Sequence, residues 1–387
     1  MNRTVITNAK IIIGDDILRG KDLVIEDEII KDIVPSGTVS GEIVEAEGRY
    51  LSAGFVDIHV HGGGGADFMD GAEGYVDACN SHSMHGTTTI VPTTISADFE
   101  QTKFAIEQFN IAKKDKRIKI HMPGLHLEGP YLNPAMAGAM KPELLKAPCE
   151  REYMALYEAS EGSIIRWTAA PELEGAIEFG RAMSDRGVVM SMGHSDATYD
   201  DVKRAVNNGY SLVTHLYSAC SSIKRIGGFR HAGIVESAYL FDDLNVEIIA
   251  DGCHLPNQLL QFVAKLKRTE NIAMITDAMR AACQDVEYSF LGSKESPQPV
   301  VIEDGVAKLL DRQAFGGSIA TTDRLVRTMK NAGIPLARAV RMITECPASF
   351  LGLRNVGKLQ NGYRANLVLF DDDINVSKVM VKGEFIR

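Results

Sequence analysis

A chain of 387 residues with 45 % apolar and 24 % charged residues has an ordinary globular composition and is long enough for one large domain and one smaller one. Its formal charge of −10, with no run of lysine and arginine, argues against nucleic acid and anionic membranes as partners, although a local cationic pocket for a small anion is compatible with it. Six scattered cysteines without a C-x-x-C pair, an N-terminus unlike a secretory signal and no apolar run of about 18 residues predict a cytoplasmic protein with free thiols and no membrane span.

Short alternating strands are predicted at both ends of the chain, over residues 4–50 and again over 366–387. Neither end builds a core alone, because two or three strands are marginally stable in water. We therefore expect one small β-sandwich assembled from both termini, with residues 1–53 and 347–387.

Between the two ends, eight compact apolar segments alternate with segments of helical periodicity. The strands are predicted at 55–61, 87–93, 120–128, 164–170, 188–194, 211–216, 246–251 and 272–277. Helices are predicted between most of them, for instance at 98–113, 175–186, 198–208 and 257–268. Eight strands alternating with helices imply a (β/α)₈ barrel, placed over residues 54–346. A hairpin turning at Asp304 and Gly305 follows the eighth strand.

Histidines and acidic residues gather where the predicted barrel strands end, which is where such barrels carry their chemistry. His59 and His61 close the first strand, and as residues i and i+2 they point to the same side. The later strand ends add Glu128, His194, His215, Asp251, His254 and Asp277. An isolated His-x-His is more often a packed pair than a ligand pair, but five of the ten histidines fall at this one rim. Four imidazoles with two carboxylates predict a divalent transition-metal site, for zinc first and iron, manganese or cobalt as alternatives.

Eight short motifs follow one another over nearly the whole chain. They are "GFVDIHVHG", "HLEGPYLNP", "GHSDAT", "THLYSA", "ADGCHL", "TDAM", "GGSIATTDRLVR" and "GYRANLVLFD". Together they resemble the amidohydrolase superfamily, and within it the N-acetylglucosamine-6-phosphate deacetylase family. The resemblance implies that Glu128, His194 and His215 hold the principal metal. It also implies that His59 and His61 hold a second ion, with Glu128 bridging the two.

The reaction that this resemblance implies is hydrolysis of the acetamide of an N-acetylhexosamine 6-phosphate. A bound divalent ion lowers the pKa of its water from about 15.7 to about 7. Asp277 would take the proton of that water and later deliver it to the leaving amine. Many binuclear relatives bridge their ions with a carboxylated lysine on the fourth strand. The predicted fourth strand here offers Arg166 instead, which favours the deacetylases.

Met140 departs from the family's pattern. Several deacetylases carry a histidine at this place, twelve residues after the metal glutamate, where it polarises the acetyl carbonyl. A thioether cannot donate a hydrogen bond. We expect a second cation on His59 and His61 to polarise that oxygen instead.

The predicted substrate-binding residues also depart from the family. Ser218 stands where the family has an asparagine that helps hold the phosphate, and the backbone at Ala219 offers a further donor. Arg225 and Arg230 are the candidates for the family's arginine, which reaches the phosphate in the neighbouring subunit and so implies a homodimer. His254 keeps its family position and is predicted to contact the sugar or the phosphate.

Three classes of function therefore stay open. The first is deacetylation of N-acetylglucosamine 6-phosphate, with its galactosamine epimer as a variant. The second is hydrolysis of another N-acyl or cyclic amide in the same fold. The third is an inert ligand-binding homologue, against which the complete ligand set argues, because degenerate homologues usually lose such residues first.

Overall fold

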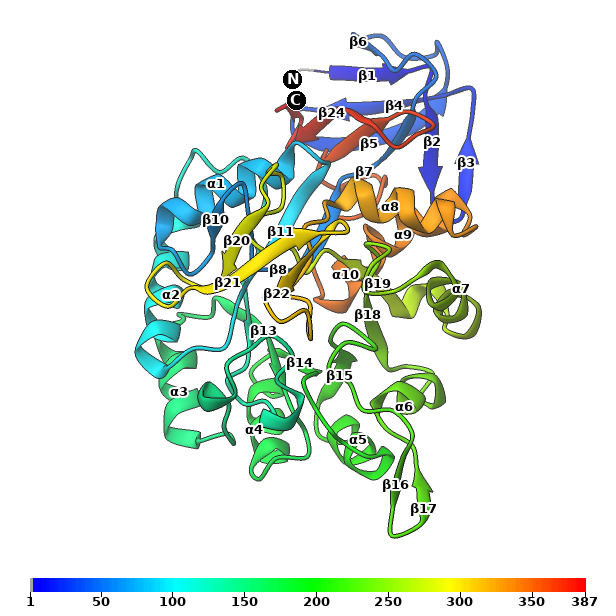
Figure 1. The fold of residues 1–387 in the computed structure, drawn as a ribbon. Coiled ribbons are helices and arrows are strands. Elements are labelled where there is room, and N and C mark those ends of the chain that lie inside the picture. Colours follow the sequence, from blue (N-terminus) through cyan, green and yellow to red (C-terminus); the bar gives the residue numbers. More distant parts are fainter. Residues whose placement is uncertain (1–2) are drawn as a thin grey trace.

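The predicted barrel is confirmed by the computed structural model, which describes residues 3–387 and places the eight strands in one parallel sheet (Figure 1). Their order around the sheet is β19-β18-β15-β14-β13-β12-β11-β8. The strands are β8 (Phe55–Val60), β11 (Thr87–Thr94), β12 (Leu125–Glu128), β13 (Ile164–Ala169), β14 (Val189–Met192), β15 (Tyr210–Val213), β18 (Asn245–Ile249) and β19 (Ile272–Ile275). Main-chain hydrogen bonds between the end of β8 and the residues that follow β19 nearly close the barrel: Asp277 N donates to His59 O at 2.9 Å, and His61 N donates to Ala278 O at 2.8 Å.

One strand begins well inside its predicted range. β12 begins at Leu125, whereas the apolar pattern starts at Ile120. Pro123 lacks the N–H that a sheet ladder needs and the flexible Gly124 follows it, so the chain breaks there. Only a single bridge from His121 to Thr89 joins the earlier part to β11.

Helices surround the barrel (Figure 1). They are α1 (Ala72–Ser83), α2 (Phe99–Ala112), α3 (Glu150–Ala159), α4 (Ala176–Ser184), α5 (Tyr199–Val206), α6 (Ile234–Leu240), α7 (Asn257–Leu266), α8 (Thr322–Asn331), α9 (Leu336–Met342) and α10 (Glu345–Phe350), with short 3₁₀ turns η1 (Pro134–Met136), η2 (Pro142–Leu144) and η3 (Thr269–Asn271). The buried apolar residues of these helices belong to the same core as those of the strands. In α7, for example, Leu260 and Val263 are buried one turn apart, as an amphipathic helix requires. Within residues 3–387 we find no helix that is both long and apolar enough to cross a membrane.

Strands from both termini form the predicted smaller β module. A four-stranded sheet runs β5-β4-β1-β6, and a six-stranded sheet runs β25-β24-β23-β7-β2-β3, so strands from the two chain ends pair in one sheet. The bounds are β1 (Arg3–Thr7), β2 (Lys10–Ile13), β3 (Asp16–Leu18), β4 (Lys21–Glu26), β5 (Ile29–Pro35), β6 (Glu42–Glu45), β7 (Tyr50–Ala53), β23 (Leu367–Phe370), β24 (Val376–Val381) and β25 (Glu384–Phe385). Ile6, Ile11, Leu23, Leu51 and Leu367 share its separate apolar core. The division of the chain at residues 53 and 347 stays a prediction.

A three-stranded antiparallel sheet after β19 lies over the barrel strands in Figure 1, where it is yellow. It consists of β20 (Tyr288–Leu291), β21 (Gln298–Glu303) and β22 (Val306–Leu309). The predicted turn at Asp304 and Gly305 is confirmed, with left-handed φ angles of 54° and 77° that suit a type I′ turn. Two further pairs are β9 (Gly62–Gly63) with β10 (Ala66–Asp67), and β16 (Lys224–Ile226) with β17 (Phe229–His231).

Candidate active site

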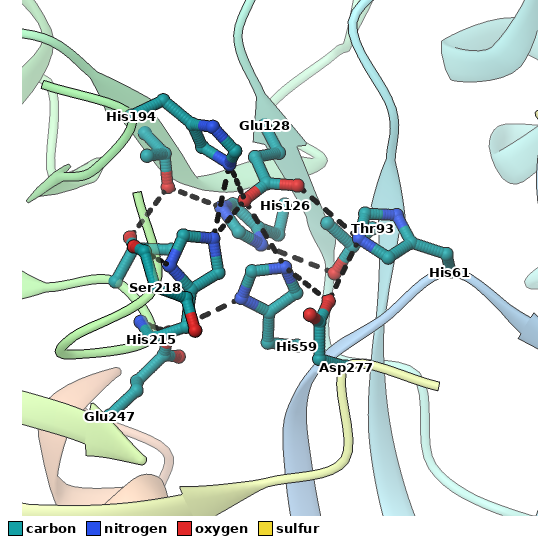
Figure 2. A network of polar contacts seen from close by, with 12 residues as sticks. His59, His61, Thr93, His126, Glu128, His194, His215, Ser218, Glu247 and Asp277 are labelled. Carbon is teal, nitrogen blue, oxygen red and sulfur yellow. Dashed lines mark hydrogen bonds and ion pairs between the residues drawn. The ribbon is translucent and has the colours of Figure 1, made fainter. Parts of the chain in front are cut away.

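The six residues predicted to carry the chemistry come together at the C-terminal end of the barrel (Figure 2). They are His59, His61, Glu128, His194, His215 and Asp277, and all six are buried. His194, His215 and Asp277 each follow a strand with a positive φ, of 48°, 29° and 49°. Left-handed backbone is unfavourable for such residues and is typical of functional sites, where the surrounding structure imposes it.

Glu128 lies at the centre of this group. Its Oε1 lies 2.9 Å from His215 Nε2 and 3.3 Å from His194 Nε2. Its Oε2 lies 3.3 Å from His61 Nε2. Two sets of potential ligands therefore share Glu128, one with His59 and His61 and the other with His194 and His215, and within each set the ligand atoms lie within 4.8 Å of one another. A glutamate placed in this way can bridge two cations.

The histidine nitrogens are oriented as metal ligands. The Nδ1 atoms of His194 and His215 lie 3.0 Å and 3.1 Å from main-chain carbonyls, so each Nδ1–H donates there and each Nε2 keeps its lone pair. Those two Nε2 atoms face each other at 3.2 Å, a contact that a cation between them would make favourable. The buried His59 Nε2 has no hydrogen-bond partner among the described residues. The donor set and this unpaired nitrogen fit a divalent metal.

The charges of the site also favour a bound cation. Burial raises the pKa of the Glu128 carboxyl, but the charge of His59 and hydrogen bonds from His194 and His215 outweigh it and hold that pKa well below its usual value. Burial likewise disfavours the charged form of His59, yet Glu128 and Asp277 raise its pKa to about 9. The pKa of His61 is likewise raised by Asp277 and Glu128, so without a metal, protons on His59 and His61 would balance the carboxylates, and a divalent ion competes with those protons for the same places.

A cavity of about 240 Å³ opens onto these ligands. Of the predicted substrate-binding residues, it is lined by Met140, Ser218, Ala219 and His254. Its apolar wall consists mainly of Ile95, Ala139, Leu291 and Phe315. The last two come from the β20–β22 sheet and the segment that follows it, which therefore cover the cavity.

Arg225 and Arg230 do not line this cavity. They face each other across the β16–β17 hairpin, and both are exposed. In Figure 1 this hairpin projects from the bottom of the molecule, away from the β20–β22 sheet. Neither arginine lies at the site of its own chain.

Two buried polar residues beside the site, His126 and Glu247, went unnoticed in the sequence, and so did the partner of Arg166. His126 packs edge-on against His59 with ring centroids 4.8 Å apart, and its Nε2 lies 2.7 Å from the hydroxyl of Thr168. Glu247 Oε2 lies 3.2 Å from His59 Nδ1, and Arg166 pairs with Glu247. The available signal was a charged residue inside an otherwise apolar strand, since such a group must find a buried partner.

A (β/α)₈ barrel whose rim holds two adjoining candidate cation sites beside the Asp277 carboxylate has the architecture of a metal-dependent hydrolase. The chain belongs to the Amidohydrolase family, whose sequence profile matches residues 50–386. It is therefore a hydrolase of a metal-dependent family.

Similar proteins cover nearly the whole chain. An N-acetylglucosamine-6-phosphate deacetylase of Lysinibacillus sphaericus is 31 % identical over 346 residues, covering 88 % of this chain and 86 % of that protein. An N-acetylgalactosamine-6-phosphate deacetylase of Escherichia coli O157:H7 is 30 % identical and covers 93 % of both chains. The crystal structure of N-acetylglucosamine-6-phosphate deacetylase from Pasteurella multocida superposes with a TM-score of 0.91 at 29 % identity and covers 99 % of both chains.

Proposed function

We propose that the protein hydrolyses the acetamide of an N-acetylhexosamine 6-phosphate to acetate and the amino-sugar phosphate. The observation that carries this proposal is the pair of cation sites that share Glu128, with Asp277 on the wall of the same cavity. The names of the similar proteins supply the substrate class. N-acetylglucosamine 6-phosphate is the first candidate, and the galactosamine epimer is the second because two relatives of nearly the same identity bear that name.

The proposed cofactor is one or two divalent ions per chain, zinc first and iron, manganese or cobalt as alternatives, because imidazole and carboxylate donors suit these metals. Glu128, His194 and His215 would hold the first ion, and His59 and His61 would hold the second together with Glu128. When bound, such ions polarise a carbonyl oxygen and lower the pKa of a coordinated water.

Asp277 is the proposed general base and acid. Burial raises the pKa of this carboxyl, but the positive charges of His59 and His61 outweigh it and lower the pKa to about 2, so Asp277 is ionised at neutral pH. Its side chain is 12 % exposed and borders the cavity. Asp277 takes a proton from the attacking water and donates it to the nitrogen when the C–N bond breaks.

The other cavity residues bind the substrate in this proposal. Asp251 Oδ2 lies 2.8 Å from His254 Nδ1 and so leaves Nε2 of His254 for a sugar or phosphate oxygen. Ser218 and the backbone at Ala219 supply further polar contacts, and Met140 packs beside the acyl group. Arg225 or Arg230 would reach the phosphate of a neighbouring subunit, so the active form is a homodimer. A cytoplasmic location, predicted from the cysteines, completes the proposal.

Acetate release tests this function. Protein supplied with Zn²⁺ or Mn²⁺ is offered N-acetylglucosamine 6-phosphate, its galacto epimer, both unphosphorylated sugars and N-acyl amino acids. We expect turnover of a phosphorylated sugar, and the preferred epimer identifies the substrate. Turnover of N-acyl amino acids alone would support another amide hydrolase, and no turnover with metal bound would support an inert homologue.

A further inference from the structure

A buried ion pair spans the barrel interior beside the histidines. Arg166 on β13 and Glu247 on β18 are both fully buried, and two nitrogens of the guanidinium contact the two carboxylate oxygens, one of them at 2.9 Å. The remaining donor capacity of Arg166 goes to Ser191 Oγ at 2.9 Å, Thr214 Oγ1 at 2.9 Å and Ile58 O at 3.1 Å. The carboxylate of Glu247 is therefore neutralised and held in one orientation.

Glu247 also fixes the ring of His59. Its Oε2 lies 3.2 Å from His59 Nδ1, so Nδ1–H donates to the carboxylate and Nε2 turns its lone pair toward Glu128 and Asp277 (Figure 2). A carboxylate behind a ligating histidine sets its tautomer and strengthens it as a ligand.

The other three histidines of the site lack such a carboxylate. The Nδ1 atoms of His194 and His215 face main-chain carbonyls, and that of His61 has no partner within the described part of the chain. Glu247 does lie 3.4 Å from the main-chain nitrogen of His215, but that contact does not orient the His215 ring. The ion pair therefore acts on the second cation site and hardly on the first.

We propose that Glu247 is a positioning residue that sets the affinity of the second metal ion through His59, and that Arg166 holds the Glu247 carboxylate in the orientation that His59 needs. The inference rests on the proposed function, because it assumes the two cation sites. Glu128 takes the bridging place that a carboxylated lysine fills in other relatives, and the arginine on β13 supports His59 through Glu247.

Two double variants test the role of Glu247 without leaving Arg166 as an unpaired buried charge. In R166M/E247L, His59 loses its partner, whereas in R166M/E247Q the amide oxygen still accepts from Nδ1. The matched control is Glu172→Gln, the same change in a carboxylate that bonds to Ser195 beside the first site and has no contact with His59. Stepwise Zn²⁺ affinities are measured by competition with a chromophoric chelator, and thermal unfolding of the metal-free proteins reports folding.

R166M/E247L is expected to bind the second ion about 10- to 100-fold more weakly than the wild type, with the first ion unchanged. R166M/E247Q should recover most of that loss, and E172Q should match the wild type. If R166M/E247L does not fold, the comparison is made between R166M/E247Q and the wild type, where the smaller loss that remains should fall on the second ion alone. Equal weakening of both ions, or of neither, would overturn the inference. A wild type that binds no Zn²⁺ would instead refute the proposed function.

Discussion

Substitution of Asp277 by asparagine tests the proposed chemistry most directly. The amide has nearly the same shape as the carboxylate, so its oxygen still fits 3.4 Å from His59 Nε2 and 3.2 Å from His61 Nε2, but it cannot accept a proton at neutral pH. A positioned acid–base group contributes about 10²–10⁴-fold to the rate, which corresponds to about 3–5 kcal/mol in the activation barrier. Water in the cavity of about 240 Å³ can replace part of this function, so we expect a loss within this range and not beyond it.

The assay is acetate release at saturating metal, with metal content measured on the same samples. We expect kcat to fall while the metal content stays at the wild-type value. Asp57→Asn is the control, because Asp57 is a buried carboxyl near Asp277 that does not line the cavity. Its pKa is raised by burial to about 7, and it accepts hydrogen bonds from Thr276 and, at 3.4 Å, from the main-chain nitrogen of His59. An unchanged rate in Asp277→Asn would remove that residue from the acid–base role, and a joint loss of rate and metal would make it a ligand instead.

Three further perturbations check other parts of the proposal. Glu128→Gln removes the carboxylate that both cation sites share, so elemental analysis should find both ions lost, and retention of two ions would contradict the bridging role. Met140→Leu should leave kcat/KM nearly unchanged, because the two side chains have similar volumes and neither donates a hydrogen bond; a large loss would show that the thioether has a direct role. The hydrogen bond to Asp323 raises the pKa of His85 from 6.5 to about 10, so the stabilisation from this pair should be complete below pH 6.5 and disappear as the pH rises to about 10. The difference in Tm between the wild type and His85→Asn should shrink over that range, and a difference independent of pH would exclude the charged pair.

Periodicity was sufficient to predict the barrel because each strand is buried on both sides and is separated from the next by an amphipathic helix. All eight strands lie within their predicted ranges or within a residue of them, apart from the delayed start of β12. That exception has a local cause, since Pro123 and Gly124 interrupt the apolar run. The pairing of strands from the two chain ends was also predictable, because neither end has enough strands to bury a core by itself.

The convergence of the six candidate residues could be predicted for a related reason. In a parallel barrel every strand ends at the same rim, so residues far apart in sequence meet there once the strands are identified. Strand topology alone therefore brings Glu128 beside His194, His215 and the His59–His61 pair.

The hydrogen-bond partners of the side chains near that rim could be identified only from the tertiary structure. Arg166 and Glu247 pair although they lie 81 residues apart in the chain. The sequence does not show which residue inside the barrel a long side chain reaches. The placement of Phe315 over the cavity and of Arg225 on a hairpin away from it depends likewise on loop conformation, which short-range patterns do not encode. The sequence by itself determined the barrel and the ring of ligands, because both follow from the repeat of strand and helix. Only the tertiary structure decided what holds each ligand in place, because hydrogen bonds across the barrel depend on register and side-chain reach.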